Sequence, residues 1–158
     1  MPKPFVLLLV IGLTSMVACA PVVGQSHEPK DLPISASWSG DYPVSAIDQL
    51  PAGQQQSRVG FFASAAAFAK VWQHFHPGEV IPAVDFAKYL VLFSRNVDFY
   101  NRTNIFKVTL TNGVIDILAM ETMSARPIDK QAAMALAVVP RGGVRAIRLD
   151  ATRTLPVE

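Results

Sequence analysis

Cysteine is nearly absent from the sequence, since its 158 residues contain only Cys19. A single thiol excludes an intramolecular disulfide and a metal centre held by several cysteines. Charged residues are also few, at 16%, and fourteen lysines and arginines stand against twelve aspartates and glutamates. A net charge of +2 gives no electrostatic support for a nucleic-acid partner, and none is expected.

The common catalytic motifs are missing as well. The sequence has no Gly-x-Ser-x-Gly nucleophile motif, no His-Glu-x-x-His metal motif and no glycine-rich phosphate loop. His74 and His76, with Glu79 nearby, are the one metal-like grouping, yet residues two apart on a helix point to different sides. A zinc centre needs three or four converging ligands, so we expect no metal and no cofactor. A small hydrolase that uses these histidines is a distant alternative to a chain without catalysis.

One long hydrophobic run stands at the N-terminus. Residues 1–4 carry a single positive charge at Lys3, and residues 5–17 are apolar or neutral, which is the layout of an export signal. The run is shorter than the roughly 20 residues that a membrane-spanning helix needs. We therefore expect residues 1–18 to be a signal peptide.

The end of this run, Met16-Val17-Ala18-Cys19, resembles the lipobox of bacterial lipoproteins. The resemblance implies cleavage before Cys19 and attachment of a lipid to its thiol, which would anchor the chain to a membrane of the cell envelope. Ala20 in the next position looks like the pattern of outer-membrane sorting, if the host has two membranes. Two alternatives remain open: an ordinary signal-peptidase site that cuts before Pro21, and an incidental cysteine.

Residues 19–33 have little apolar periodicity and contain three prolines, which is typical of a tether, here a lipidated one. We expect a single folded domain over residues 34–158. Trp38 and Tyr42, beside Gly40, are either a stacking platform for a sugar or aromatic residues that pack on the edge of the core.

A helix and a strand form the expected centre of this domain. Large apolar side chains recur at helical spacing in residues 65–75, Ser64 is a suitable N-cap, and Pro77-Gly78 ends the run. The apolar residues of this helical face are Phe68, Val71, Trp72 and Phe75. After a proline-marked connection, residues 89–93 form a continuous apolar run that predicts a central strand under the helix.

Asn112-Gly113 predicts a tight hairpin between residues 105–110 and 114–122, because both turn residues tolerate positive φ. Counting outward from this turn places Phe106, Val108 and Leu110 on the core side. The same count places Glu121 on that side, where Arg95 or Arg126 could pair with it.

The opposite face of the hairpin would then carry an apolar strip, made of Ile105, Val114, Leu118 and Met120. Either another part of the chain covers this strip, or the strip is a docking face for a partner, since contiguous exposed apolar surface marks interaction sites.

These elements predict an α+β domain: an antiparallel sheet of about five or six strands with one main helix on one face. Residues 59–147 resemble the PrcB-like C-terminal domain of bacterial envelope proteins. The resemblance rests on the helix with Trp72, residues 82–86, the strand around Val91 and a late apolar strand that ends at Pro140. It implies a small non-catalytic domain, whose named member is an accessory lipoprotein of a surface-exposed protease complex.

The sequence therefore favours a lipid-anchored envelope protein without catalysis that binds or assembles with another protein. The resemblance makes an exported protease one such partner. A periplasmic ligand-binding lipoprotein is the alternative from a different class, and a deep apolar pocket lined by Trp38 and Tyr42 would favour it.

Overall fold

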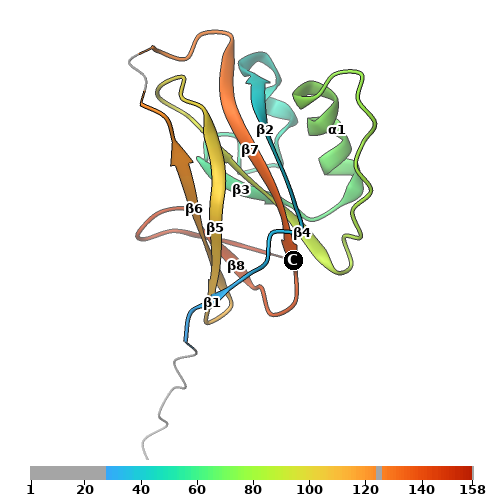
Figure 1. Cartoon of the computed structure of the whole chain (residues 1–158), viewed down its shortest axis with the longest axis vertical. Helices are drawn as coiled ribbons and strands as arrows, with labels where there is room; N and C mark the ends of the chain where they lie inside the picture. The colour runs from blue at the N-terminus through green and yellow to red at the C-terminus, as the bar shows by residue number, and fades with distance from the viewer. Residues whose placement is uncertain (1–27, 124–125, 158) are drawn as a thin grey trace, which may run out of the picture.

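The computed structural model describes residues 28–123 and 126–157, which form two stacked β-sheets with one α-helix on the outer face of the second sheet (Figure 1). The first sheet has five strands in the order β1-β5-β6-β8-β9, and the second has four in the order β2-β7-β4-β3. All strand pairs are antiparallel except β6 with β8. The expected antiparallel sheet with one main helix is therefore present in outline, but its strands are divided between two sheets.

The strands of the first sheet are β1 (Lys30–Asp31), β5 (Thr103–Thr111), β6 (Val114–Glu121), β8 (Ala146–Arg148) and β9 (Thr154–Pro156). Those of the second are β2 (Ala36–Pro43), β3 (Val59–Phe62), β4 (Tyr89–Arg95) and β7 (Gln131–Pro140). A 3₁₀ helix, η1 (Val44–Gln49), follows β2, and α1 (Ala65–Phe75) follows β3.

Helix α1 has the bounds and the buried face that its apolar spacing predicts. The side-chain oxygen of Ser64 accepts a hydrogen bond from the Ala67 amide at 3.3 Å, which satisfies one of the free amides of the first turn. All four large apolar residues of the predicted face are buried. Gly78, at φ +82°, lies just after the helix in a conformation that favours glycine.

Strand β4 is internal to its sheet, between β3 and β7, and both of its faces are buried. Val91 and Phe93 pack with α1, whereas Leu90 and Leu92 pack against the first sheet. Strand β7 alternates in the same way, because Met134 and Leu136 face the helix side, whereas Ala135 and Ala137 face the first sheet.

This two-sided burial explains why the prediction of one sheet is wrong. A strand with one solvated face alternates apolar and polar residues, whereas residues 89–93 and 132–139 are continuously apolar. Such runs need a layer on each side. The helix covers one face of the second sheet, and the first sheet covers the other.

The hairpin of β5 and β6 forms at the predicted turn, but its register changes at Phe106. Thr111 pairs with Val114 and Val108 with Ile117, as predicted, with Asn112 and Gly113 at φ 51° and 80°. A β-bulge then inserts Phe106, so that Lys107 pairs with Leu118 and Ile105 with Ala119. Ile105 is consequently buried in the core, whereas Phe106 is exposed.

The bulge changes which side chains of β5 are buried. Regular alternation would bury Asn104 together with Phe106, and a buried amide without hydrogen-bond partners is costly. The bulge buries Ile105 and Thr103 in their place and leaves Asn104 in solvent. The Thr103 hydroxyl has no hydrogen-bond partner among the described residues, so the bulge replaces a buried amide by a smaller buried polar group.

The domain begins earlier than expected. Lys30 and Asp31 pair with Leu110 and Thr109 of β5, and Leu32 is buried in the core between the sheets. Lys30 and Asp31, near the end of the expected tether, therefore belong to the first sheet. Within residues 28–123 and 126–157, no helix has the length and apolar character required to cross a bilayer.

Candidate binding surfaces

Cys19, the predicted lipidation site, and the predicted signal peptide of residues 1–18 lie outside the described residues. The hypothesis of a lipid anchor therefore stays a prediction from the sequence.

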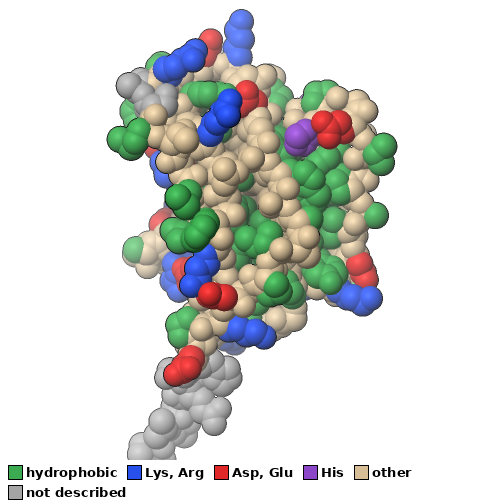
Figure 2. Space-filling view, viewed as in Figure 1, with side chains coloured by type: hydrophobic (Ala, Val, Ile, Leu, Met, Phe, Trp, Pro, Cys, Tyr) green, Lys and Arg blue, Asp and Glu red, His purple; other side chains and the backbone are tan. Residues whose placement is uncertain are grey.

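An exposed apolar patch occupies the outer face of the hairpin. We define the hairpin patch as Phe106, Leu118 and Met120, which are 66%, 53% and 58% exposed. Leu118 and Met120 lie two positions apart on β6 and so share a face. Figure 2 shows hydrophobic side chains that stand out from the surface over β5, with charged side chains below them.

The hairpin patch differs from the predicted strip in two members. Ile105 is buried between the sheets because of the bulge, and Val114 is only half-buried at the opposite end of β6, beside β8. Phe106, which the regular register placed in the core, takes the position of Ile105. No described element covers Leu118 or Met120, so these two predicted residues do lie on an open face.

Ion pairs border the patch on the same sheet. Lys107 Nζ lies 3.0 Å from the Asp31 carboxylate, and Arg148 pairs with Asp116 across β6 and β8. A small apolar centre with a charged border is the composition of a protein–protein interface rather than of a small-molecule pocket.

The histidines do not form a metal site. His74 is exposed on α1, whereas the His76 ring packs against Trp72 and Phe75, with its Nδ1 3.2 Å from Glu79 Oε1. Among the described residues, no three histidine, cysteine, aspartate or glutamate side chains are placed to hold a metal ion.

Trp38 and Tyr42 do not form a shared platform. Tyr42 is buried, and its hydroxyl donates a hydrogen bond to Ala46 O at 2.7 Å. The Trp38 ring packs edge-on against Trp72, with 5.2 Å between ring centroids, and lines a hollow of about 410 Å³ beside residues 82–85. The deep pocket lined by both aromatic residues, which would favour a ligand-binding protein, is therefore not formed.

The charged residues that were expected to pair have different partners. Glu121 forms an ion pair with Arg58 at 3.7 Å. The buried guanidinium of Arg95 instead donates to the backbone oxygens of Ser57 and Gln55, and burial lowers its pKa. These contacts fix the loop before β3, so the role of Arg95 is structural.

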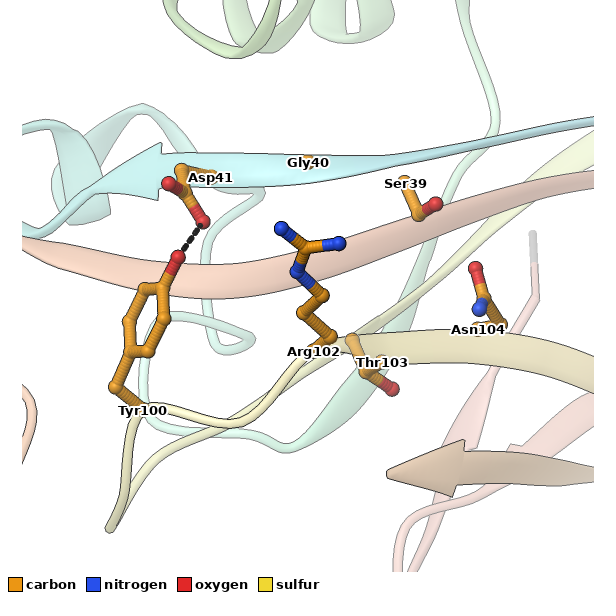
Figure 3. Close-up of a pocket in the computed structure, with 7 residues that line it drawn as sticks. All are labelled: Ser39, Gly40, Asp41, Tyr100, Arg102, Thr103 and Asn104. Carbon is orange, nitrogen blue, oxygen red and sulfur yellow. Dashed lines mark hydrogen bonds between the residues drawn. The ribbon is translucent and has the colours of Figure 1, made fainter. Parts of the chain in front are cut away.

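A polar hollow of about 340 Å³, which we call the edge groove, lies between β2 and the start of β5. Residues 39–41 line one side, and residues 100 and 102–104 line the other (Figure 3). Tyr100 donates a hydrogen bond to Asp41 Oδ1 at 2.7 Å, and this bond raises the pKa of Tyr100. Sequence reasoning missed the edge groove because its two sides lie about 60 positions apart and meet only through the stacking of the sheets.

Comparisons of the chain with family models, with curated proteins and with solved structures gave no match.

Proposed function

We propose that the chain is a lipid-anchored protein of the bacterial cell envelope whose domain binds another protein without catalysis. The observation that carries the proposal is the hairpin patch, three large apolar side chains on a sheet face that no described element covers. The lipobox-like motif at Cys19 supports the anchor. An exported protease is the partner that the resemblance to PrcB-like domains suggests.

The position of the patch suits a chain tethered at its N-terminus. The first described residues lead into β1, which pairs with β5 near the hairpin turn, whereas the patch lies toward the other end of β5 and β6. About five residue steps of roughly 3.3 Å separate Leu110 from Ile105 along β5. The domain would therefore present its apolar patch away from the end that is joined to the membrane.

The anchor is tested by metabolic labelling with a palmitate analogue in a bacterial host. The wild-type chain takes up the label and fractionates with membranes, whereas Cys19→Ser does neither, and Ser26→Ala serves as the matched control in the tether. Labelling of Cys19→Ser at the wild-type level would contradict the anchor.

The protein-binding role is tested separately, with a photoreactive amino acid in place of Leu118. Irradiation of cells should give one dominant adduct with an exported protein, and Phe106→Ser together with Met120→Ser should reduce it at least fivefold. The same probe at Lys70, exposed on α1, should give no such adduct. An adduct that forms equally from position 70, or only between copies of this chain, would contradict the proposal.

A further inference from the structure

The edge groove lies between two strand edges that have open backbone groups. Strand β2 is the last strand of its sheet and pairs only with β7. Val44 N–H donates a hydrogen bond to Lys130 O, and along an antiparallel strand the backbone groups of successive residues point to alternate sides. The backbone groups of Tyr42 and Gly40 therefore face β7 as well. The N–H and C=O groups of Ser37, Ser39 and Asp41 therefore point away from the sheet.

The start of β5 supplies the second edge, which is unpaired although Thr103 itself is buried. Arg102 O accepts a hydrogen bond from Thr122 N, so the backbone groups of Arg102 face β6. The backbone groups of Thr103, the next residue, therefore face away from β6. Strand β1 pairs with β5 only at Thr109 and Leu110, so it does not cover Thr103.

Three polar side chains point into the groove from its two sides. Ser39 extends from β2, while Arg102 and Asn104 extend toward β2 from the β5 side (Figure 3). In the described part of the chain, these three side chains have no hydrogen-bond partner, and the Arg102 guanidinium has no carboxylate within ion-pair distance. The Asp41 carboxylate is instead engaged by the Tyr100 hydroxyl.

The groove has a defined length. The Tyr100–Asp41 hydrogen bond closes one end. The chain between β1 and β2 crosses at the other end, where Leu32 N donates to Val108 O and Ser35 N to Val138 O. The open edge from Ser37 to Asp41 spans four residue steps, or about 13 Å at 3.3 Å per residue.

We infer that the edge groove binds an extended peptide segment of four or five residues that adds to β2 as a further strand and places a carboxylate on Arg102. Alternating amides and carbonyls along an open edge are complementary to an extended backbone, which is the basis of recognition by strand addition. Arg102 selects a carboxylate because a planar guanidinium can bind it through two parallel hydrogen bonds. The site is separate from the hairpin patch, and the inference does not depend on the lipid anchor.

The probe is a phage-displayed library of random heptapeptides, selected on the purified full chain. Selected sequences are then synthesised and their dissociation constants are measured for the wild type, Arg102→Gln and Ser39→Pro. Proline at position 39 removes an outward amide and is acceptable on an edge strand. Lys70→Gln is the matched control, since it removes one exposed positive charge from α1.

We expect Arg102→Gln and Ser39→Pro each to weaken peptide binding at least tenfold, while Lys70→Gln leaves it unchanged. Replacing the carboxylates of the peptide one at a time by amides, at its C-terminus and on its acidic side chains, identifies which one Arg102 binds. Bound peptide should also slow the hydrogen exchange of the Ser39 and Asp41 amides and leave that of Gly40, already bonded to β7, unchanged.

The inference is overturned if no peptide is enriched over selection on the Ser39→Pro, Arg102→Gln double variant, or if Arg102→Gln binds the selected peptides as tightly as the wild type. Competition by inorganic phosphate at the peptide's own concentration would show a simple anion site instead. Self-association that Ser39→Pro abolishes would show that β2 pairs with a second copy. Because Arg102 is exposed, its variant stays informative even where Ser39→Pro fails to fold.

Discussion

Tyr42 links the end of β2 to the 3₁₀ helix that follows it. Its buried hydroxyl donates to Ala46 O, and burial raises the pKa of Tyr42 to about 12. Tyr42→Phe leaves that carbonyl without its partner, so we expect a loss of about 1 kcal/mol in the free energy of unfolding at pH 8. Urea unfolding followed by tryptophan fluorescence measures this difference.

The same side chain predicts a loss of stability at high pH. In the unfolded chain a tyrosine loses its proton near pH 10, whereas folded Tyr42 keeps it to about pH 12. The folded state therefore binds more protons in this window, and stability must fall as pH rises from about 10 to about 12. The free energy of unfolding of Tyr42→Phe should fall less steeply over the same window, with a slope that is smaller by up to about 1.4 kcal/mol per pH unit. Equal slopes for the two proteins would exclude this role for Tyr42.

Gly60 on β3 is required because two side chains occupy the space of a β-carbon. A Cβ there would overlap Gln54 Oε1 and would lie within 2.5 Å of the Phe93 ring. Gln54 Oε1 cannot move freely, because it accepts a hydrogen bond from the Phe61 amide at 2.8 Å. We expect Gly60→Ala to lower the free energy of unfolding by about 3 kcal/mol. Gly142→Ala is the matched control, with no atom within 4 Å of its Cβ, and should change it by less than about 0.5 kcal/mol. Similar unfolding midpoints for the two variants would contradict the crowding at Gly60.

Single residues were predictable where one local rule determined their environment. The buried face of α1 and the Ser64 cap follow from helical spacing and capping chemistry, and both are confirmed. Ile105 was not predictable, because a bulge moves every residue beyond it to the other face without changing the local pattern.

The bulge itself is open to a test at the level of the element. Deleting Phe106 would remove the extra residue and leave Lys107 paired with Leu118 and Ile105 with Ala119, as now. We expect this deletion to be tolerated, with a loss of about 1 kcal/mol or less, although deletions inside strands usually reverse their faces. Thermal unfolding and circular dichroism check that the sheets persist.

Deleting Thr109 from the same strand is the control. The remaining alternation would place Lys107 in the core position of Val108, and an unpaired buried ammonium group is strongly destabilising. That variant should be unfolded or lose more than about 4 kcal/mol. If both deletions are equally harmful, the bulge is not a separable insertion.

Whole elements were predictable in proportion to their apolar content. Helix α1, β4, the β5–β6 hairpin and β7 were anticipated from periodicity, apolar runs and the Asn-Gly turn. Strands β1 and β9 were not, because they are short, mostly exposed segments that become strands only by pairing at a sheet edge. The edge groove could not be predicted for the same reason, since it depends on which strand edges remain open.

At the scale of the molecule, two cores share the second sheet as their common layer, and β4 and β7 are the two inner strands of that sheet. Along each of these two strands, alternate side chains are buried in the helix-side core and in the core between the sheets. A change in one core therefore acts on the backbone that also builds the other. We infer that the described domain unfolds as one cooperative unit.

Ile147 on β8 and the two tryptophans test this coupling. Ile147 is fully buried between the sheets, whereas Trp38 and Trp72 belong to the helix-side core. We expect Ile147→Ala to reduce the free energy of unfolding by about 2–4 kcal/mol, through the lost apolar contacts and the cavity left behind. The denaturation midpoint from tryptophan fluorescence should shift by as much as that from circular dichroism, which reports on both sheets. A fluorescence midpoint that stays at the wild-type value, while circular dichroism shows an earlier transition, would mean that the two cores unfold independently and that β4 and β7 do not couple them.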